Sequence, residues 1–241
     1  MSDPVLAGRG LSKRYGDLLV LDRVDFAVAR GDAVGIVGPN GAGKTTLLSV
    51  LAGAVAPSAG TVHIDGQDVT RLRPELRCRR GVGRAFQIPR PFGGMTVLEN
   101  VLVGAAYGAG LSRAAAYERS VEVLDRCGLV EHANRRADSL GLLHRKRLEL
   151  ARSLATDPRV LLLDEIGAGL TDAEAAELVT TIRELHKLDI AIVWIEHIVH
   201  VLVQVVERLV CMDAGRVIAD GPPSTVLRDA VVVDAYLGKA L

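Results

Sequence analysis

The chain has 241 residues, a length that suits one domain with room for a sizeable hydrophobic core. Its 29 Lys and Arg balance its 29 Asp and Glu, and aromatic residues make up only 3%, which argues against binding of nucleic acid by charge or by base stacking. No apolar run reaches the roughly 18 residues that a membrane-spanning helix needs. Without a signal-peptide pattern or a C-x-x-C cysteine pair, we expect a globular protein of the reducing cytosol.

Short apolar runs alternate with helical patterns along most of the chain. Three runs, 34–37, 160–163 and 190–195, contain no charged residue, as in strands that are buried on both faces of a parallel sheet. A glycine-rich turn after the first run leads into a predicted helix at 44–51. The capping-box spacing of Thr171–Glu174 predicts the start of another helix after the second run. This alternation predicts an α/β fold.

Other parts of the chain depart from this alternation. The β-prone segments 18–28 and 61–64 predict an antiparallel β layer near the N-terminus. The middle of the chain, 87–153, has mostly helical patterns, and the prolines and glycines at its start predict an irregular beginning. Near the C-terminus, 209–212 and 216–219 are predicted strands, and two short helices follow them.

A phosphate-binding motif, G-x-x-x-x-G-K-[ST], stands in full between the first predicted strand and its helix. Its glycines allow backbone amides to curl around phosphate oxygens at a helix N-terminus. Lys44 can reach the β- and γ-phosphates of a nucleotide, and the Thr45 hydroxyl can hold Mg²⁺. A glycine-rich turn without a ligand is the alternative. We predict an ATP and Mg²⁺ site whose binding residues are Gly38, Pro39, Asn40, Gly41, Ala42, Gly43, Lys44, Thr45 and Thr46.

Two carboxylates, Asp164 and Glu165, follow the second apolar run. At a strand end beside the phosphate loop, Asp164 can bind Mg²⁺ directly or through water. Glu165 can orient or deprotonate the attacking water. An acidic pair after a strand is otherwise a solvated edge, but its combination with the phosphate loop favours the catalytic interpretation.

Together these motifs resemble the nucleotide-binding subunits of ATP-binding-cassette (ABC) transporters over nearly the whole chain. The resemblance implies a P-loop NTPase core with an N-terminal antiparallel β layer and a helical sub-domain at about 88–155, within a single domain, 1–241. It also implies that two ATP-binding subunits enclose two ATP molecules between them. Each site then combines the phosphate loop of one subunit with the signature motif of the other.

The resemblance gives roles to three further residues. Tyr15 matches the aromatic residue that stacks on adenine, although an ordinary tyrosine at a strand edge is the alternative. Gln87 matches the glutamine that contacts Mg²⁺ and water and responds to the membrane partner. His197 matches the switch histidine that contacts the γ-phosphate. His200 lies three residues later without an accompanying set of ligands, so we do not expect the two histidines to bind a metal.

Four segments are similar to the branched-chain amino-acid importer ATPases of the LivG type: 86–92, 95–101, 168–170 and Ala235–Gly238. The similarity implies a peripheral ATPase on the cytoplasmic face of the inner membrane. Its implied partners are transmembrane permease subunits, a second ATP-binding subunit in a heterodimer and, indirectly, a solute-binding protein. The implied solutes are branched-chain amino acids or related small polar compounds such as urea.

The signature motif departs from the family pattern, Leu-Ser-Gly-Gly-Gln, because the corresponding segment here is Leu140–His144. Gly141 lacks the hydroxyl that contacts a γ-phosphate, and we expect the Leu143 side chain to hinder close backbone approach. Backbone amides at the helix start could still suffice. If the partner is a different ATPase with an intact signature, the pair has one competent site and one impaired site.

Seven arginines lie close together in the chain, at Arg71, Arg73, Arg77, Arg79, Arg80, Arg84 and Arg90. The neutral net charge favours a solvated helix face that contacts a membrane partner, and we predict no nucleic-acid partner. Two other functions stay open. One is a soluble ABC ATPase unconnected with transport, and the other is a regulatory module that binds ATP and hydrolyses little of it.

Overall fold

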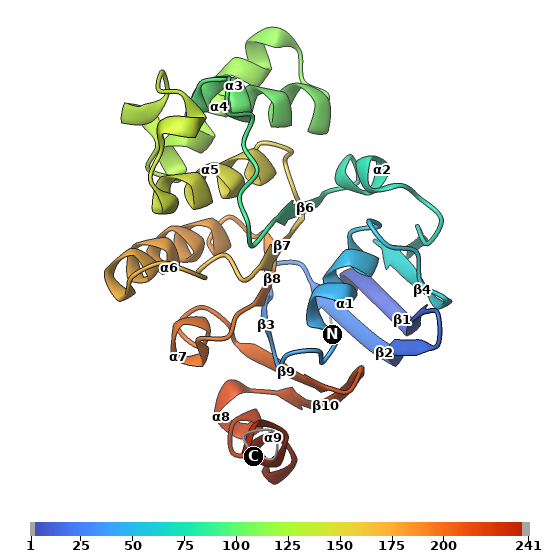
Figure 1. The fold of residues 1–241 in the computed structure, drawn as a ribbon. Coiled ribbons are helices and arrows are strands. Elements are labelled where there is room, and N and C mark those ends of the chain that lie inside the picture. Colours follow the sequence, from blue (N-terminus) through green and yellow to red (C-terminus); the bar gives the residue numbers. More distant parts are fainter. Residues whose placement is uncertain (1–2, 238–241) are drawn as a thin grey trace.

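The computed structural model describes residues 3–237. A six-stranded sheet forms the centre of the fold (Figure 1). Its strand order is β10–β9–β3–β8–β7–β6, in which β10 is antiparallel to β9 and the other neighbours are parallel. The strands are β3 (Ala33–Val37), β6 (Val82–Ala85), β7 (Val160–Asp164), β8 (Ala191–Ile195), β9 (Arg208–Asp213) and β10 (Arg216–Gly221). The α/β fold predicted from the apolar runs is confirmed.

A second sheet is antiparallel and has the strand order β2–β1–β4–β5. Its strands are β1 (Pro4–Tyr15), β2 (Leu18–Ala29), β4 (Ala59–Ile64) and β5 (Gln67–Asp68). The predicted antiparallel layer is therefore confirmed, but the sequence pattern did not indicate β1. A strand is recognised in a sequence by the alternation of inward and outward residues. In β1, a shift of register between Gly8 and Leu11 interrupts this alternation.

Helices follow the core strands and pack on both faces of the central sheet. α1 (Lys44–Leu51) follows β3, and α6 (Asp172–His186) follows β7. The predicted capping box of α6 is present, because Thr171 and Glu174 each accept a hydrogen bond from the other's backbone amide. The remaining C-terminal helices are α7 (Val199–Leu202), α8 (Pro223–Val226) and α9 (Ala230–Leu237), and Gly238 of the segment Ala235–Gly238 lies outside the described residues.

The predicted helices in the middle of the chain form a separate layer, at the top of Figure 1. The layer contains α3 (Val97–Val103), the π-helix Gly104–Gly108, α4 (Arg113–Arg126), the 3₁₀ turns Val130–His132 and Ala137–Ser139, and α5 (Leu142–Leu154). The short helix α2 (Pro74–Cys78) precedes β6, and residues 86–96 form the irregular segment that the prolines and glycines predict. Within the described part of the chain, no helix has the length and apolar character needed to cross a bilayer.

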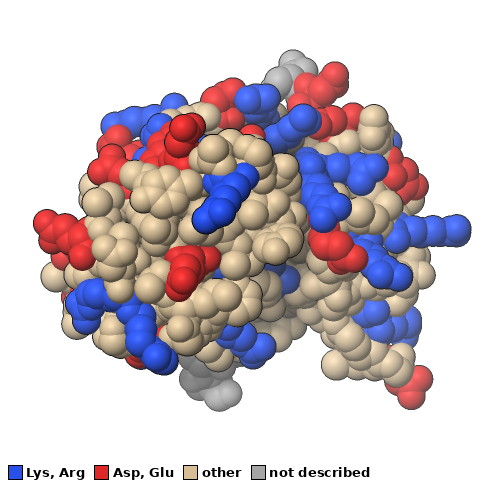
Figure 2. All heavy atoms as spheres, turned by 90° about the horizontal axis from the view of Figure 1, so that it is seen from above, with Lys and Arg blue, Asp and Glu red and all other residues tan. Residues whose placement is uncertain are grey.

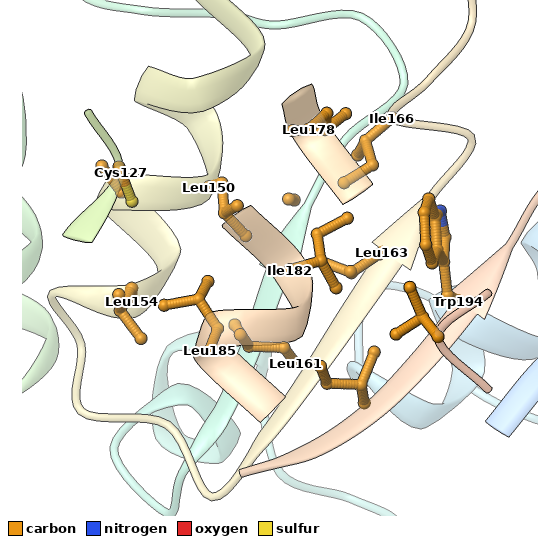
Figure 3. Packing of buried hydrophobic residues seen from close by; sticks show 14 of the residues in the cluster. Cys127, Leu150, Leu154, Leu161, Leu163, Ile166, Leu178, Ile182, Leu185 and Trp194 are labelled. Carbon is orange, nitrogen blue, oxygen red and sulfur yellow. The ribbon is translucent and has the colours of Figure 1, made fainter. Parts of the chain in front are cut away.

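Alternate residues of β7 face two different hydrophobic clusters. Leu161 and Leu163 lie in the cluster with α5 and α6, and Figure 3 shows them beside Ile182 and Leu185. Leu162 belongs to the cluster that includes α1 and the antiparallel sheet. All five side chains are buried, and close packing on both faces restricts movement of the strand. The end of β7, where Asp164 lies, is therefore held in a fixed place.

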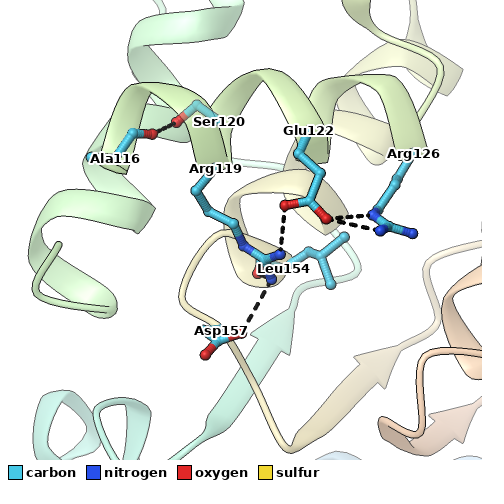
Figure 4. A network of polar contacts seen from close by, with 7 residues as sticks. All are labelled: Ala116, Arg119, Ser120, Glu122, Arg126, Leu154 and Asp157. Atoms are coloured by element: carbon cyan, nitrogen blue, oxygen red, sulfur yellow. Dashed lines mark hydrogen bonds and ion pairs between the residues drawn. The ribbon is translucent and has the colours of Figure 1, made fainter. Parts of the chain in front are cut away.

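Arg119 of α4 connects the helical layer to the turn that precedes β7 (Figure 4). Its guanidinium donates to the Leu154 carbonyl at 3.2 Å and to Asp157 at 3.3 Å. It also pairs with Glu122 at 3.1 Å, and Glu122 pairs with Arg126 at 2.8 Å. Each exposed ion pair of this kind contributes little to the free energy of unfolding. The contact of Arg119 with the Leu154 carbonyl, however, joins α4 to the end of α5.

Charges of both signs are interspersed over the face shown in Figure 2, as the zero net charge leads one to expect. Five members of the arginine cluster are exposed, as predicted: Arg71, Arg73, Arg79, Arg80 and Arg90. They do not form the predicted helix face, because none of the five lies within the bounds of a helix.

Arg77 is an exception, because it is only 1% exposed. Its guanidinium donates to the carbonyls of Val50 at 2.7 Å, Leu51 at 2.9 Å and Thr70 at 2.9 Å. The first two carbonyls end α1, where a cation also offsets the negative end of the helix dipole. The prediction of a solvated position is therefore wrong for Arg77, which caps the helix that carries the phosphate loop.

We expect Arg77→Met to lower the free energy of unfolding by about 3 kcal/mol, because buried carbonyls lose a charged donor. Urea denaturation of the purified chain measures this change. The exposed neighbour Arg79→Met serves as the control, with an expected change below about 0.5 kcal/mol. Equal unfolding midpoints for the two variants would contradict the assigned role of Arg77.

Candidate functional site

The phosphate loop lies between β3 and α1 and lines a cavity of about 240 Å³. The cavity is lined by residues 40–46, by Val20 of β2 and by Glu165. Gly38 has φ 146°, and a Cβ atom there would lie 2.1 Å from the Met212 carbonyl oxygen, so a side chain does not fit. The structure thus brings most of the predicted phosphate-binding residues to one concave surface.

The Lys44 amino group lies inside this loop and is shielded from solvent, since the residue is 5% exposed. It donates hydrogen bonds to the carbonyls of Gly38 at 2.7 Å and Pro39 at 3.0 Å. Burial lowers the pKa of Lys44, while the nearby carboxylates of Glu165 and Asp164 act in the opposite direction. A buried cation in a glycine-rich loop at the start of a helix is suited to an anionic group such as a phosphate.

Asp164 and Thr45 provide two oxygen atoms at the side of the loop. The Thr45 hydroxyl donates to Asp164 Oδ1 at 3.2 Å. Hydroxyl and carboxylate oxygens are ligands that Mg²⁺ prefers, and few protein ligands are needed because Mg²⁺ retains waters and phosphate oxygens. The donor set therefore fits Mg²⁺.

Glu165 contacts two of the residues predicted to act with it. Its carboxylate accepts a hydrogen bond from Gln87 Nε2 at 2.6 Å and lies 2.9 Å from His197 Nε2. The three residues come from different chain segments: Gln87 follows β6, Glu165 follows β7 and His197 follows β8. Glu165 has φ 48°, an uncommon backbone conformation of the kind that often accompanies functional sites. The predicted catalytic side chains are thus adjacent, beside the phosphate loop.

Tyr15 does not line the cavity of the phosphate loop. It ends β1, is 49% exposed, and has the Lys13 amino group 4.9 Å from its ring centre. A contact between Tyr15 and adenine stays a prediction.

The signature segment places its leucines differently from the expectation. Leu143 is 7% exposed and packs in the core, so the prediction that its side chain hinders backbone approach is wrong. The exposed leucine is Leu142, at 42%, which follows Gly141 at the start of α5. The His144 ring meets the His132 ring edge-on at 4.4 Å between centres. The surface offered by this segment therefore consists of Gly141, Leu142 and His144.

Three charged residues with side chains largely shielded from solvent were not assigned to the site by sequence analysis. Lys146 of α5 donates to the Gln87 carbonyl at 2.9 Å. Arg84 of β6 pairs with Asp164 at 2.9 Å, and the prediction of a solvated position is wrong for it as well, because the strand directs it inward. Glu196 accepts hydrogen bonds from the Gly167 amide at 2.7 Å and from the Trp194 indole at 3.3 Å. A charged residue within or next to an apolar run is the signal that could have indicated Arg84 and Glu196.

The pKa of Glu196 is raised by burial, although its hydrogen bonds with Gly167 and Trp194 act in the opposite direction. The unfolded carboxyl therefore loses its proton at a lower pH than the folded one. The protonated carboxyl therefore stabilises the folded chain at low pH. This stabilisation is lost as the pH rises from the pKa of an ordinary carboxyl group through the raised pKa of Glu196.

We expect Glu196→Gln to remove this loss, because an amide oxygen can accept the same two hydrogen bonds without ionising. Thermal unfolding between about pH 4 and pH 8 tests the expectation. The melting temperature of the variant minus that of the unmodified chain should increase as the pH rises. The exposed Glu184→Gln is the control, and parallel curves for Glu196→Gln and the unmodified chain would refute the effect.

Comparison with known proteins places this site in a family. The ABC transporter family matches residues 21–168, and the family described as branched-chain amino acid ATP-binding cassette transporter matches residues 216–241. The chain is 36% identical to the high-affinity branched-chain amino acid transport ATP-binding protein LivG of Salmonella typhi. It is also 36% identical to the corresponding protein BraF of Pseudomonas aeruginosa, and each alignment spans 255 residues and covers 100% of both chains.

Solved structures agree with these relatives. A nucleotide-free ATP-binding cassette from an ABC transporter is similar with a TM-score of 0.88 and 30% identity, covering 97% of this chain and 99% of that one. The ADP conformation of an ATP-binding cassette of an ABC transporter is similar with the same score and identity, covering 98% and 100%. The chain belongs to the ABC transporter family, as a subunit that binds and hydrolyses ATP.

Proposed function

We propose that this ATPase powers an importer for branched-chain amino acids or related small polar solutes such as urea. It would act as a peripheral subunit on the cytoplasmic face of the inner membrane. The observation that carries the catalytic part is the contact of Glu165 with both Gln87 and His197 beside the phosphate loop. The transport part is supported by full-length similarity to LivG and BraF, whose names specify branched-chain amino acid transport.

In the proposed site, loop amides and the Lys44 ammonium bind the β- and γ-phosphates, and Tyr15 stacks on adenine. Thr45, Asp164 and Gln87 would hold Mg²⁺. When bound, Mg²⁺ would neutralise negative charge on the phosphate oxygens as the γ-phosphoryl group is transferred to water.

Hydrolysis requires a water molecule aligned with the γ-phosphate. Glu165 is proposed to orient that water and to accept its proton, because it lines the cavity of the phosphate loop. The contact at 2.9 Å lets His197 hold the carboxylate in place from one side, and Gln87 holds it from the other. Gln87 belongs to the irregular segment 86–96, so movement of that segment can alter the catalytic arrangement.

The permease subunits are proposed to contact a groove of about 340 Å³ beside this segment. Phe86, Val103 and Gly104 contribute to its lining, together with residues of α2 and α5. The neighbouring side chains of Ile88 and Phe92 are 66% and 44% exposed, an apolar character that suits a protein partner. The groove and these exposed side chains together form part of the proposed permease surface, which extends over residues 87–103 and begins at Gln87.

A heterodimer with a second ATPase is proposed because Gly141 and Leu142 provide no side-chain donor at the signature position. In such a pair, the site containing Glu165 has an intact signature from the other subunit and carries most of the turnover. Glu165→Gln in the reconstituted pair should then abolish nearly all ATP hydrolysis. Retention of about half of the activity would show that both sites contribute equally.

Affinity purification tests the proposed partners. The tagged Glu165→Gln chain is purified from its native cells after membranes are solubilised with Mg-ATP present, and Lys44→Ala is purified in parallel as the control. We expect two permeases and a second ATPase to co-purify with Glu165→Gln. Recovery of soluble proteins alone would contradict the transport proposal and favour an ABC ATPase unconnected with transport.

A further inference from the structure

Arg84 connects the proposed Mg²⁺ site to the groove proposed for the permease. It lies on β6, three residues before Gln87, and its side chain is only 10% exposed. Arg84 lines two cavities. One is the groove of about 340 Å³, and the other is a cavity of about 400 Å³ that reaches Thr45 and Asp164.

Asp164 has a different partner on each carboxylate oxygen. Oδ1 accepts the Thr45 hydroxyl at 3.2 Å, and Oδ2 accepts Nη2 of Arg84 at 2.9 Å. A rotation that turned Oδ1 away from Thr45 would break both hydrogen bonds. Arg84 and Thr45 together therefore restrain rotation of the Asp164 carboxylate, whose side chain is only 6% exposed.

Arg84 is itself held by two further contacts. Nη1 donates to Ser49 Oγ at 3.2 Å, and Ser49 Oγ donates to the Thr45 carbonyl at 2.7 Å. On the groove side, the guanidinium carbon lies 4.6 Å from the centre of the Phe86 ring. The arginine thus joins α1, the end of β7 and an aromatic residue at the groove.

We propose that Arg84 is a positioning residue that fixes the Asp164 carboxylate for Mg-nucleotide and links it, through Phe86, to the groove. The inference rests on the proposed function and specifies how that site is organised and regulated. Residues that hold a metal ligand from behind commonly change metal affinity or activity by about 10- to 100-fold when replaced. Lys at this position would keep the charge but could not donate to Asp164 and Ser49 from one planar group.

The test measures the Mg²⁺ dependence of nucleotide binding. Mg²⁺ is titrated into the purified chain in the presence of a fluorescent ATP analogue, and binding of the analogue in EDTA is measured separately. For Arg84→Met we expect the Mg²⁺ midpoint to rise about tenfold or more, with binding in EDTA unchanged. Arg84→Lys should lie between this variant and the unmodified chain. Arg80 is exposed and lies nearby in the chain, so Arg80→Met should have the Mg²⁺ midpoint of the unmodified chain.

An unchanged Mg²⁺ midpoint in Arg84→Met would overturn the proposal. An equal loss of binding in EDTA and in Mg²⁺, with a lower melting temperature, would also overturn it by showing a merely structural role. If Arg84→Met does not fold, the Mg²⁺ midpoint of Arg84→Lys is the test, and an unchanged midpoint in that variant would overturn the proposal. The double variant with Asp164→Asn should be no worse than Asp164→Asn alone, and additive effects would contradict action through Asp164. Failure of the unmodified chain to bind the nucleotide would instead reject the proposed function.

Discussion

Glu165→Gln is expected to lower the rate of ATP hydrolysis by about 10³-fold while leaving ATP binding intact. The amide keeps the size of the side chain, but it cannot accept a proton from the attacking water. Because the contacts with Gln87 and His197 involve the carboxylate oxygens, Glu165 is placed at the centre of the site. Phosphate release by the assembled transporter and binding of a fluorescent ATP analogue measure the two effects separately.

Glu184→Gln is the matched control, since its carboxylate is exposed on α6 and pairs with Lys187. It should hydrolyse ATP at the rate of the unmodified transporter. Turnover by Glu165→Gln within about tenfold of that rate would mean that another group accepts the proton.

Lys44→Ala is expected to weaken ATP binding by at least about 100-fold, because it removes the buried cation of the phosphate loop. The loss should be seen in the presence and in the absence of Mg²⁺, since the ammonium is proposed to contact phosphate directly. The binding change separates this variant from Glu165→Gln, which should still bind the nucleotide. Titration with the fluorescent ATP analogue gives the affinities.

A control on the surface, Lys187→Ala, should bind ATP as the unmodified chain does. The carbonyls of Gly38 and Pro39 lose a donor in Lys44→Ala, so thermal unfolding must be measured on the same sample. Undiminished affinity in a folded Lys44→Ala chain would contradict the proposed binding of phosphate.

The sequence was most informative where a functional residue follows a continuous apolar run. Lys44 belongs to a motif with fixed spacing, and Asp164 and Glu165 directly follow the apolar run of β7. The carboxyl ends of parallel strands meet at one edge of a sheet, so these residues could be placed together before any distance was known. The chain positions of Gln87 and His197 were found by resemblance, and their contact with Glu165 required the structure.

The sequence was least informative about buried arginines. Arg77 donates to the Val50 carbonyl, 27 positions earlier, and Arg84 pairs with Asp164, 80 positions later. Whether a guanidinium is buried depends on acceptors that tertiary folding brings to it, and the local sequence does not identify those acceptors. The composition of segment 71–90 therefore predicted a uniformly solvated face, and two of its members proved to be internal.

Uptake into proteoliposomes tests most directly the central claim that this ATPase site powers import. The chain is reconstituted with its permeases and second ATPase, the solute-binding protein is loaded with labelled leucine, and Mg-ATP is supplied to the ATPase side. The account predicts leucine uptake that ceases with Glu165→Gln and persists with Glu184→Gln. Hydrolysis of ATP that depends on Glu165 without uptake of leucine, another branched-chain amino acid or urea would contradict it.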